Sequence, residues 1–170
     1  LSNGSFGIKS LSFISEKTLK ALPPLIRLKY NEFINEDSLI VMPNTIVLSM
    51  EDVFYQLVEH IEKHGYDIRC FGYDPYNADL FIQLYKSYNG EYGIEVVRQG
   101  VRTESVPLGE LKDLSEERML LFDEYIFEYA MGNCMVVEDT NGNRKLFKRR
   151  YEYKIDPVSA LVDAWIAYTK

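Results

Sequence analysis

The chain has 170 residues, a length that fits one compact domain and is too short for two separate enzymatic domains. Its 46% hydrophobic and 14% aromatic residues suffice for a packed core, which excludes disordered and low-complexity classes. The formal net charge of −7 argues against attraction of the whole surface to nucleic acid or anionic lipid. Any site for a polyanion must therefore be a local patch.

Two cysteines, Cys70 and Cys134, are too few for a disulfide framework or a structural zinc site, and we expect reduced core thiols in a cytosolic protein. No apolar run approaches the roughly 18–20 residues that a membrane span needs, and the first ten residues lack the layout of a signal peptide. We therefore expect a protein that is neither anchored nor exported. Because the sequence passes almost at once from Leu1 into a strand-like run, we also expect a piece of something longer.

The first third of the sequence carries strand and helix signals in turn. Residues 6–14 have the β-branched and aromatic content of a strand. Glu16–Ala21 is predicted to be a short helix that stops before Pro23. Two apolar segments that follow, residues 25–34 and Leu39–Met42, fit either a helix or a strand.

The middle of the sequence predicts a parallel crossover unit. It is preceded by a helix that begins at Met50, with Ser49 as its N-cap, and stops at Gly65. A buried strand, a helix and a second buried strand are then predicted over residues 66–73, 77–88 and 93–98. We expect the two strands to pair in parallel and the helix to turn one face inward, formed by Leu80, Leu84 and Tyr88.

The last third predicts helices on either side of a hairpin. Residues 107–130 show helical periodicity in two pieces, the second starting at Ser115. Cys134–Glu138 and residues 145–149 flank Asn141-Gly142, the preferred dipeptide of a tight type I′ turn. Asp156 is the predicted N-cap of a final helix over residues 157–168, whose inward side chains are Val158, Leu161, Val162, Trp165 and Ile166. The whole pattern indicates a mixed α/β domain with a central sheet.

The common catalytic motifs are absent from the sequence: there is no phosphate loop, dinucleotide fingerprint, nucleophile elbow or H-E-x-x-H zinc motif. His60 and His64 have the i, i+4 spacing that can hold zinc on a helix. No third ligand stands nearby in the sequence, so we interpret both as surface histidines.

Two Asp-Pro steps stand at junctions between predicted elements. Asp74 follows the strand that ends at Tyr73, and ligands of open α/β sheets bind at the carboxyl ends of strands. Asp156 begins the last helix, whose first turn could pack against the same rim. Two carboxylates brought together there would repel each other unless Mg²⁺ or Mn²⁺ neutralised them. The structural alternatives are a turn at Asp74 and a helix cap at Asp156, and the spacing alone does not decide.

Two further aspartates are unsuitable as partners of Asp156 in an ion site, and a group of basic residues is a candidate surface for a phosphate backbone. Asp79 is predicted to face solvent, and Asp163 lies about 10.5 Å beyond Asp156 on nearly the same helix face, too far to share an ion easily. Five basic residues crowd one arm of the hairpin, namely Arg144, Lys145, Lys148, Arg149 and Arg150. They could follow a phosphate backbone, or they could form the solvated face of a charged strand.

Several short blocks, in their order and spacing, resemble the C-terminal nuclease domain of tailed-phage terminase large subunits. They are Tyr73-Asp74-Pro75-Tyr76-Asn77-Ala78, Val96-Val97-Arg98-Gln99-Gly100, Gly132-Asn133, Asn141-Gly142-Asn143 with Lys145 and Lys148, and Lys154-Ile155-Asp156 with Ala160-Leu161. Each block is weak alone, but together they span residues 13–168.

The resemblance implies one RNase H-like α/β domain over residues 1–170, with a central mixed β-sheet flanked by helices. It implies a two-metal-ion endonuclease that uses Mg²⁺ or Mn²⁺ to cut concatemeric double-stranded viral DNA. Asp74 and Asp156 match the catalytic, metal-binding aspartates, and Lys145, Lys148 and Arg149 are the expected DNA contacts, Lys148 on a motif position. The implied partners are the terminase small subunit and the portal protein, in the host cytoplasm at the procapsid portal and without a membrane.

Two departures from the family qualify this expectation. The family's first catalytic aspartate lies upstream of the block that residues 11–19 resemble, and no acidic residue precedes Glu16 here. The ATPase half is also unmatched. We therefore expect this piece to lack one catalytic carboxylate, which keeps a non-catalytic DNA- or portal-binding module as the alternative. An unrelated RNase H-like resolvase would lack the Lys154-Ile155-Asp156 block.

Overall fold

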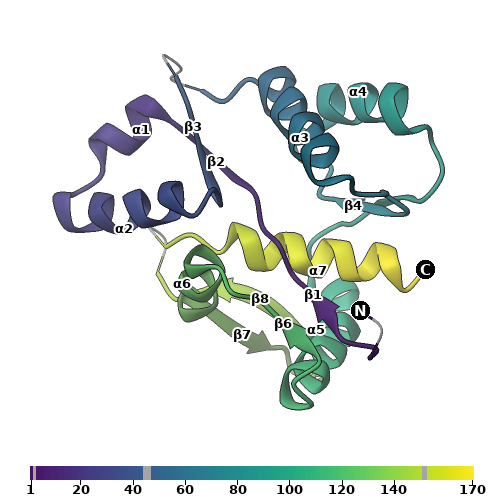
Figure 1. Ribbon diagram of the computed structural model, residues 1–170. Coiled ribbons are helices and arrows are strands. Elements are labelled where there is room, and N and C mark those ends of the chain that lie inside the picture. Colours follow the sequence, from purple (N-terminus) through teal and green to yellow (C-terminus); the bar gives the residue numbers. More distant parts are fainter. Residues whose placement is uncertain (2, 44–46, 151–152) are drawn as a thin grey trace.

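The computed structural model describes residues 1, 3–43, 47–150 and 153–170, in which strands and helices alternate along the chain (Figure 1). In order they are β1 (Phe6–Gly7), β2 (Ser12–Ser15), α1 (Glu16–Ala21), α2 (Pro24–Asn35), β3 (Leu39–Met42), α3 (Met50–His64), β4 (Phe71–Tyr73), α4 (Asp79–Asn89), β5 (Ile94–Val96), α5 (Val101–Glu116), β6 (Leu120–Leu121), α6 (Tyr125–Asn133), β7 (Cys134–Glu138), β8 (Arg144–Lys148) and α7 (Asp156–Tyr168). No helix in this described part of the chain is both long and apolar enough to cross a membrane.

The strands are mixed in direction, but the described ones do not form the single central sheet that we expected. They pair as four two-stranded sheets: β1 with β6, β2 with β3 and β4 with β5 in parallel, and β7 with β8 antiparallel. The parallel strands are short, because charged and exposed residues interrupt the apolar runs. The strand predicted over residues 66–73 is an example: Asp67 and Arg69 form an exposed ion pair at 3.0 Å, and only Phe71–Tyr73 are paired.

The predicted crossover unit is confirmed, although its helix turns a different face inward. β4 and β5 are parallel, with Phe71 opposite Ile94, and α4 joins them. The buried side chains of α4 are Ile82 and Tyr85, whereas Leu80 and Tyr88 are exposed. The stacking of Tyr85 on Phe71, with ring centroids 4.2 Å apart, sets this face.

Helix boundaries follow the sequence where a local cap determines them. In α3 the Ser49 hydroxyl accepts the N–H of Asp52 at 3.2 Å, and α1 has the expected bounds. The segment after α1 is a helix, α2, that begins at Pro24, as prolines favour. Residues 6–14 are not one strand but contribute to β1 and β2.

Three boundaries in the last third differ from the prediction. α5 begins at Val101 and continues through Pro107, because the Glu104 carboxylate accepts the Gly100 N–H at 2.7 Å and fixes the start six residues earlier. No helix begins at Ser115, since α5 ends at Glu116 and α6 starts only at Tyr125. In α7, Asp156 is the first helical residue and Ile155 occupies the cap position.

The hairpin is confirmed, but its turn is longer than predicted. Residues 139–143 form the loop, with Asp139 N–H bonded to the Asn143 carbonyl at 2.8 Å, instead of a two-residue turn at Asn141-Gly142. The Asp139 side chain stabilises this loop by accepting the N–H groups of Asn141 and Asn143. Gly142 supplies the positive φ of 80° that the loop requires.

α7 lies across the middle of the molecule and contacts elements on several sides (Figure 1). Val162 and Ile166 pack with Val97 and Leu111, while Val158 packs with Phe127 and Ala130 of α6. This confirms the predicted inward face of the helix. A further apolar cluster, formed by Ile14, Phe33, Leu39 and Ile126, joins β2 and β3 to α2 and α6.

Gly72 allows β4 to lie directly on α7. A Cβ at this position would stand 2.0 Å from the Asp163 carbonyl oxygen and 3.2 Å from the Ala167 Cβ. Because the nearest atom is helix backbone, no rotamer change could relieve the overlap. The strand and helix touch here without an intervening side chain, and this contact positions Asp74, two residues further on.

We expect Gly72→Ala to separate β4 from α7 and to lower the free energy of unfolding by about 2 kcal/mol or more, the scale of overpacking in a tight core. Urea denaturation followed by circular dichroism measures the change. Gly109→Ala is the matched control, because its Cβ would meet nothing within 4 Å in α5. That control should be neutral or stabilise by about 0.5–1 kcal/mol. Equal effects of the two substitutions would contradict this account of Gly72.

Candidate active site

Asp74 stands directly after β4, where the sequence placed it. It is half-buried, and its Oδ1 accepts the N–H of Tyr76 at 3.0 Å. This is the aspartate turn expected of an Asp-Pro step. The turn fixes the orientation of the carboxylate, and the hydrogen bonds of the described residues leave Oδ2 available.

Asp163, which we had set aside, lies near enough to Asp74 for the charge of Asp74 to raise its pKa. It lies in the middle of α7 and is half-buried. Burial, followed by the negative charges of Asp74 and Glu104, raises the pKa of Asp163 to about 7. The sequence analysis compared Asp163 only with Asp156 on its own helix. The small residues Gly72 and Ala167 mark the contact that joins the two elements, but one sequence does not say which strand meets which helix.

Asp156 is exposed at the first turn of α7. Its charge reaches Tyr30 of α2, whose pKa is raised to about 12 chiefly by burial, then by Tyr129 and by Asp156. Two helical turns, about 10.5 Å, separate Asp156 from Asp163 along nearly the same face. The structure thus brings Asp74 together with Asp163, while the pairing of Asp74 with Asp156 remains a prediction.

Glu104 is a buried carboxylate that the sequence did not single out. Its Oε1 accepts the Gly100 N–H and its Oε2 accepts the Leu146 N–H, both at 2.7 Å. These charge-assisted bonds tie the start of α5 to β8. Glu104 is therefore structural, and it adds negative charge beside Asp163.

The carboxylates of Asp74 and Asp163 repel each other, and a divalent cation between them would be attracted to both. Asp74, directly after β4, and Asp163, in α7, are both half-buried, and the charges that act on Asp163 are all negative. A hard cation such as Mg²⁺ or Mn²⁺ would relieve this repulsion and takes carboxylate oxygens as ligands. No group of three or more metal-ligating side chains occurs among the residues described. Asp74 and Asp163 are the two residues that could hold such an ion.

The basic arm of the hairpin lies beside the first turns of α7. Leu146 packs against the cluster that contains Val158, which places β8 next to that helix. Lys145 and Lys148 are half-buried and Arg149 is exposed, so the arm is not a uniformly solvated face. The Lys145 ammonium lies 6.0 Å from the centre of the Phe147 ring.

The cysteines and histidines carry no sign of a second metal centre within the described residues. Cys70 and Cys134 are free thiols, as expected, but both are half-buried rather than fully in the core, and burial raises the pKa of Cys134 to about 11. His64 is exposed and stacks on Tyr66 with ring centroids 5.3 Å apart. Burial, followed by the charge of His64, lowers the pKa of His60.

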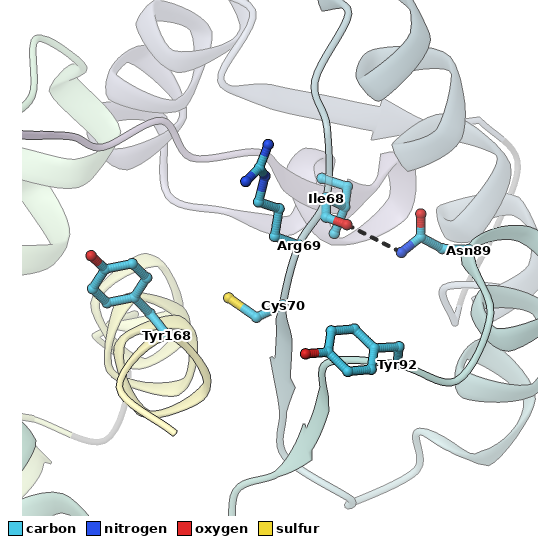
Figure 2. A pocket seen from close by; sticks show the side chains of 6 residues that line it. All are labelled: Ile68, Arg69, Cys70, Asn89, Tyr92 and Tyr168. Atoms are coloured by element: carbon cyan, nitrogen blue, oxygen red, sulfur yellow. Dashed lines mark hydrogen bonds between the residues drawn. The ribbon is translucent and has the colours of Figure 1, made fainter. Parts of the chain in front are cut away.

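A pocket of about 560 Å³ lies near the amino end of β4, away from Asp74 (Figure 2). Figure 2 shows the Cys70 thiol pointing toward Tyr168, with Arg69 and Tyr92 on either side. The Asn89 amide donates to the Ile68 carbonyl at 3.3 Å. None of the candidate carboxylates lines this pocket.

The chain is similar in sequence to proteins of known family. Two curated terminase large subunits, from Lactococcus phages p2 and SK1, are each 25% identical to it over 139 residues. The match covers 79% of this chain and 25% of each relative, so the chain spans about a quarter of their length.

The crystal structure of the HK97 bacteriophage large terminase has a similar fold, with a TM-score of 0.77 and 21% identity. That match covers 91% of this chain and 32% of the HK97 chain. The family model described as "Terminase large subunit, endonuclease domain" matches residues 2–170. Because this match takes in almost the whole sequence, the chain belongs to the family of terminase large subunit endonuclease domains.

Proposed function

We propose that this domain is the nuclease of a DNA-packaging terminase and cleaves concatemeric double-stranded DNA with the help of a divalent metal ion. Its family membership supports the nuclease activity, and the contact of Gly72 with α7, which brings the charge of Asp74 near half-buried Asp163, supports the metal site. We assign the fold to the RNase H-like class. The parallel β4-α4-β5 unit and the similarity to the HK97 terminase support that assignment.

Asp74 and Asp163 would hold the Mg²⁺ or Mn²⁺ ion. When bound, such an ion lowers the pKa of a water molecule and stabilises the leaving oxygen of the phosphodiester. Asp74 is oriented by its turn, so its free oxygen points in a fixed direction. Because the pKa of Asp163 is raised to about 7, cation binding near neutral pH would be coupled to loss of a proton from this carboxyl group. Asp156 lies two helical turns from Asp163. It is the second metal ligand that the resemblance implies, and in a two-ion mechanism it would be a ligand of the second ion.

The basic arm of the hairpin would hold the DNA. Lys145, Lys148 and Arg149 form a positive strip in a chain of net charge −7, and phosphate contacts from such a strip are independent of base sequence. The terminase small subunit and the portal protein are the proposed partners of the full-length protein. Its proposed place of action is the host cytoplasm, at the procapsid portal.

A non-catalytic DNA- or portal-binding module is the alternative function. It is favoured by the lack of any group of three metal-ligating side chains among the described residues. The two functions differ in whether ion binding depends on the carboxylates.

Asparagine substitutions distinguish the possible metal ligands. We expect Asp74→Asn and Asp163→Asn each to weaken Mn²⁺ binding, measured by isothermal titration calorimetry, at least tenfold, because each removes an anionic ligand. Cleavage of plasmid DNA should fall in parallel. Asp79→Asn, in the exposed first turn of α4, is the control and should change neither measurement.

Asp156→Asn decides which pair holds the ion. Loss of binding in this variant with normal binding in Asp163→Asn would support the pairing of Asp74 with Asp156 instead. Normal Mn²⁺ binding and cleavage in all three variants would contradict the proposed nuclease site. Absence of cleavage together with retained DNA binding would support the non-catalytic module.

The pKa of Asp163 predicts how stability depends on pH in metal-free buffer. The folded pKa of about 7 lies above the ordinary value of 3.8, so between these values the folded state binds more protons than the unfolded state. The stabilisation is complete below about pH 4 and is lost as the pH rises through 7. Urea denaturation at several pH values should therefore show a steeper decline in the native protein than in Asp163→Asn. Parallel curves would show that Asp163 titrates normally.

Replacing Lys145, Lys148 and Arg149 by Ala tests the DNA contacts. We expect weaker binding to duplexes of any sequence, with the slope of log K against log salt reduced by about 0.9 per lost contact. Fluorescence anisotropy across a salt series measures both quantities. A control with Lys20, Lys63 and Lys112 replaced removes the same charge from α1, α3 and α5. Equal losses of DNA affinity in the two triple variants would show that the net charge of the protein, and not these three side chains, determines binding.

A further inference from the structure

Asn133 is a buried polar residue at the junction of α6 and β7 that bonds to two later parts of the chain. It is the last residue of α6 and is only 7% exposed. Its backbone carbonyl accepts the N–H of Arg149 at 2.9 Å. Its side-chain amide donates to the backbone carbonyl of Lys154 at 3.0 Å. One residue therefore holds both ends of the connection that leads from β8 to α7.

The core around Asn133 gives these bonds a rigid base. Ala130 of α6 packs with Val158 of α7. Cys134 and Leu146, which belong to the two strands of the hairpin, pack against the same cluster. The end of α6, the hairpin and the first turns of α7 thus meet beside Asn133 (Figure 1). Its amide bond extends this packed region to the backbone just before α7.

The Asp156 carboxylate depends on the backbone for its position. Asp156 is exposed, and its carboxylate makes no hydrogen bond within the part of the chain that the structure describes. The backbone before it is held instead, because Ile155 is buried and the Lys154 carbonyl is bonded to Asn133. That bond lies two residues from Asp156, at the point where α7 begins.

We propose that Asn133 is a positioning residue for DNA cleavage, which keeps Asp156 in a fixed position relative to the basic arm of the hairpin. The bond to Arg149 fixes the end of that arm, and the bond to Lys154 fixes the start of α7. Such a constraint matters because a displacement of about 1 Å in a reacting group can lower a rate about a hundredfold. This inference rests on the proposed function, which assigns Asp156 to the metal site and the arm to DNA.

A change of the side chain separates the two bonds of Asn133. Asn133→Ala removes the amide that donates to Lys154 but keeps the backbone carbonyl that accepts from Arg149. We therefore expect it to loosen the start of α7 and to leave the basic arm in place. Asn133→Ser, whose hydroxyl is too short to reach the Lys154 carbonyl, is a second variant with the same expectation. Thermal melting shows whether each variant is folded.

Amide hydrogen exchange in the metal-free protein, followed by NMR, tests the structural step. The N–H groups of Val158 and Ser159 both donate to the Ile155 carbonyl at 3.0 Å and report on the first turn of α7. We expect both amides to exchange about tenfold faster in Asn133→Ala, the effect of losing one hydrogen bond. The amide of Arg149 should exchange at its native rate.

Measurements of Mn²⁺ and DNA binding test the functional step. We expect Mn²⁺ affinity, measured by calorimetry, to fall about tenfold in Asn133→Ala, while duplex affinity in EDTA stays unchanged. Asn89→Ala is the matched control, because the Asn89 amide also donates to a backbone carbonyl, that of Ile68, but lies away from Asp74 (Figure 2). This control should change neither affinity. A general loss of folded protein would instead lower the measured binding of both ligands.

A double variant tests whether Asn133 acts through Asp156. Adding Asn133→Ala to Asp156→Asn should weaken Mn²⁺ binding no further than Asp156→Asn alone. Independent losses that add would contradict the proposal, as would unchanged Mn²⁺ binding or unchanged exchange at the start of α7 in Asn133→Ala.

The single variants distinguish a failure of this inference from a failure of the proposed metal site. Weak Mn²⁺ binding in Asp156→Asn with native binding in Asn133→Ala would overturn the positioning role alone. Native binding in Asp156→Asn would overturn both the metal role of Asp156 and the positioning role of Asn133. The site formed by Asp74 and Asp163 is tested separately by their own substitutions.

Discussion

The contact between Gly72 and the backbone of Asp163 determines how the candidate site is built. Because no side chain separates β4 from α7, the end of the strand is held beside the middle of the helix. α7 is fixed in turn by the packing of Val162 against Leu111 and of Val158 against Phe127. Asp163 is thereby placed by the core, and Asp74 stands in a turn directly after the strand that contacts its helix. A site that binds an ion in a defined geometry needs such rigid support.

Placing Asp163 here is electrostatically unfavourable, because its ionised carboxylate is partly buried near other negative charges. Asp163 is partly buried beside Asp74, and Glu104 adds a third negative charge nearby. Glu104 is explained by its bonds to Gly100 and Leu146, which fix α5 and the hairpin. No comparable structural bond explains the proximity of Asp74 and Asp163 in the described part of the chain. Strongly raised pKa values of this kind concentrate at functional sites, because the cost is recovered when substrate or metal binds.

Local signals in the sequence predicted the elements well, and long-range contacts explain the failures. Ser49 caps α3, and the Asp74 turn needs only the residues that follow it. By contrast, the start of α5 depends on Glu104, whose second oxygen holds β8. The proximity of Asp163 to Asp74 depends on which helix covers β4. A single sequence records neither pairing, so the place of Asp74 at the strand end could be predicted and the proximity of Asp163 to it could not. The pairing of Asp74 with Asp156 stays a prediction.

The same buried carboxylate also explains why the hairpin has one covered edge and one open edge. Glu104 is satisfied only when α5 lies along β8, so pairing another strand with β8 would break a bond between a buried carboxylate and a backbone N–H. Leaving such a group without its partner costs more than an ordinary surface hydrogen bond. β7 has no second strand partner among the described strands. The interaction that stabilises the hairpin next to Asp163 therefore also keeps the outer edge of β8 covered by α5.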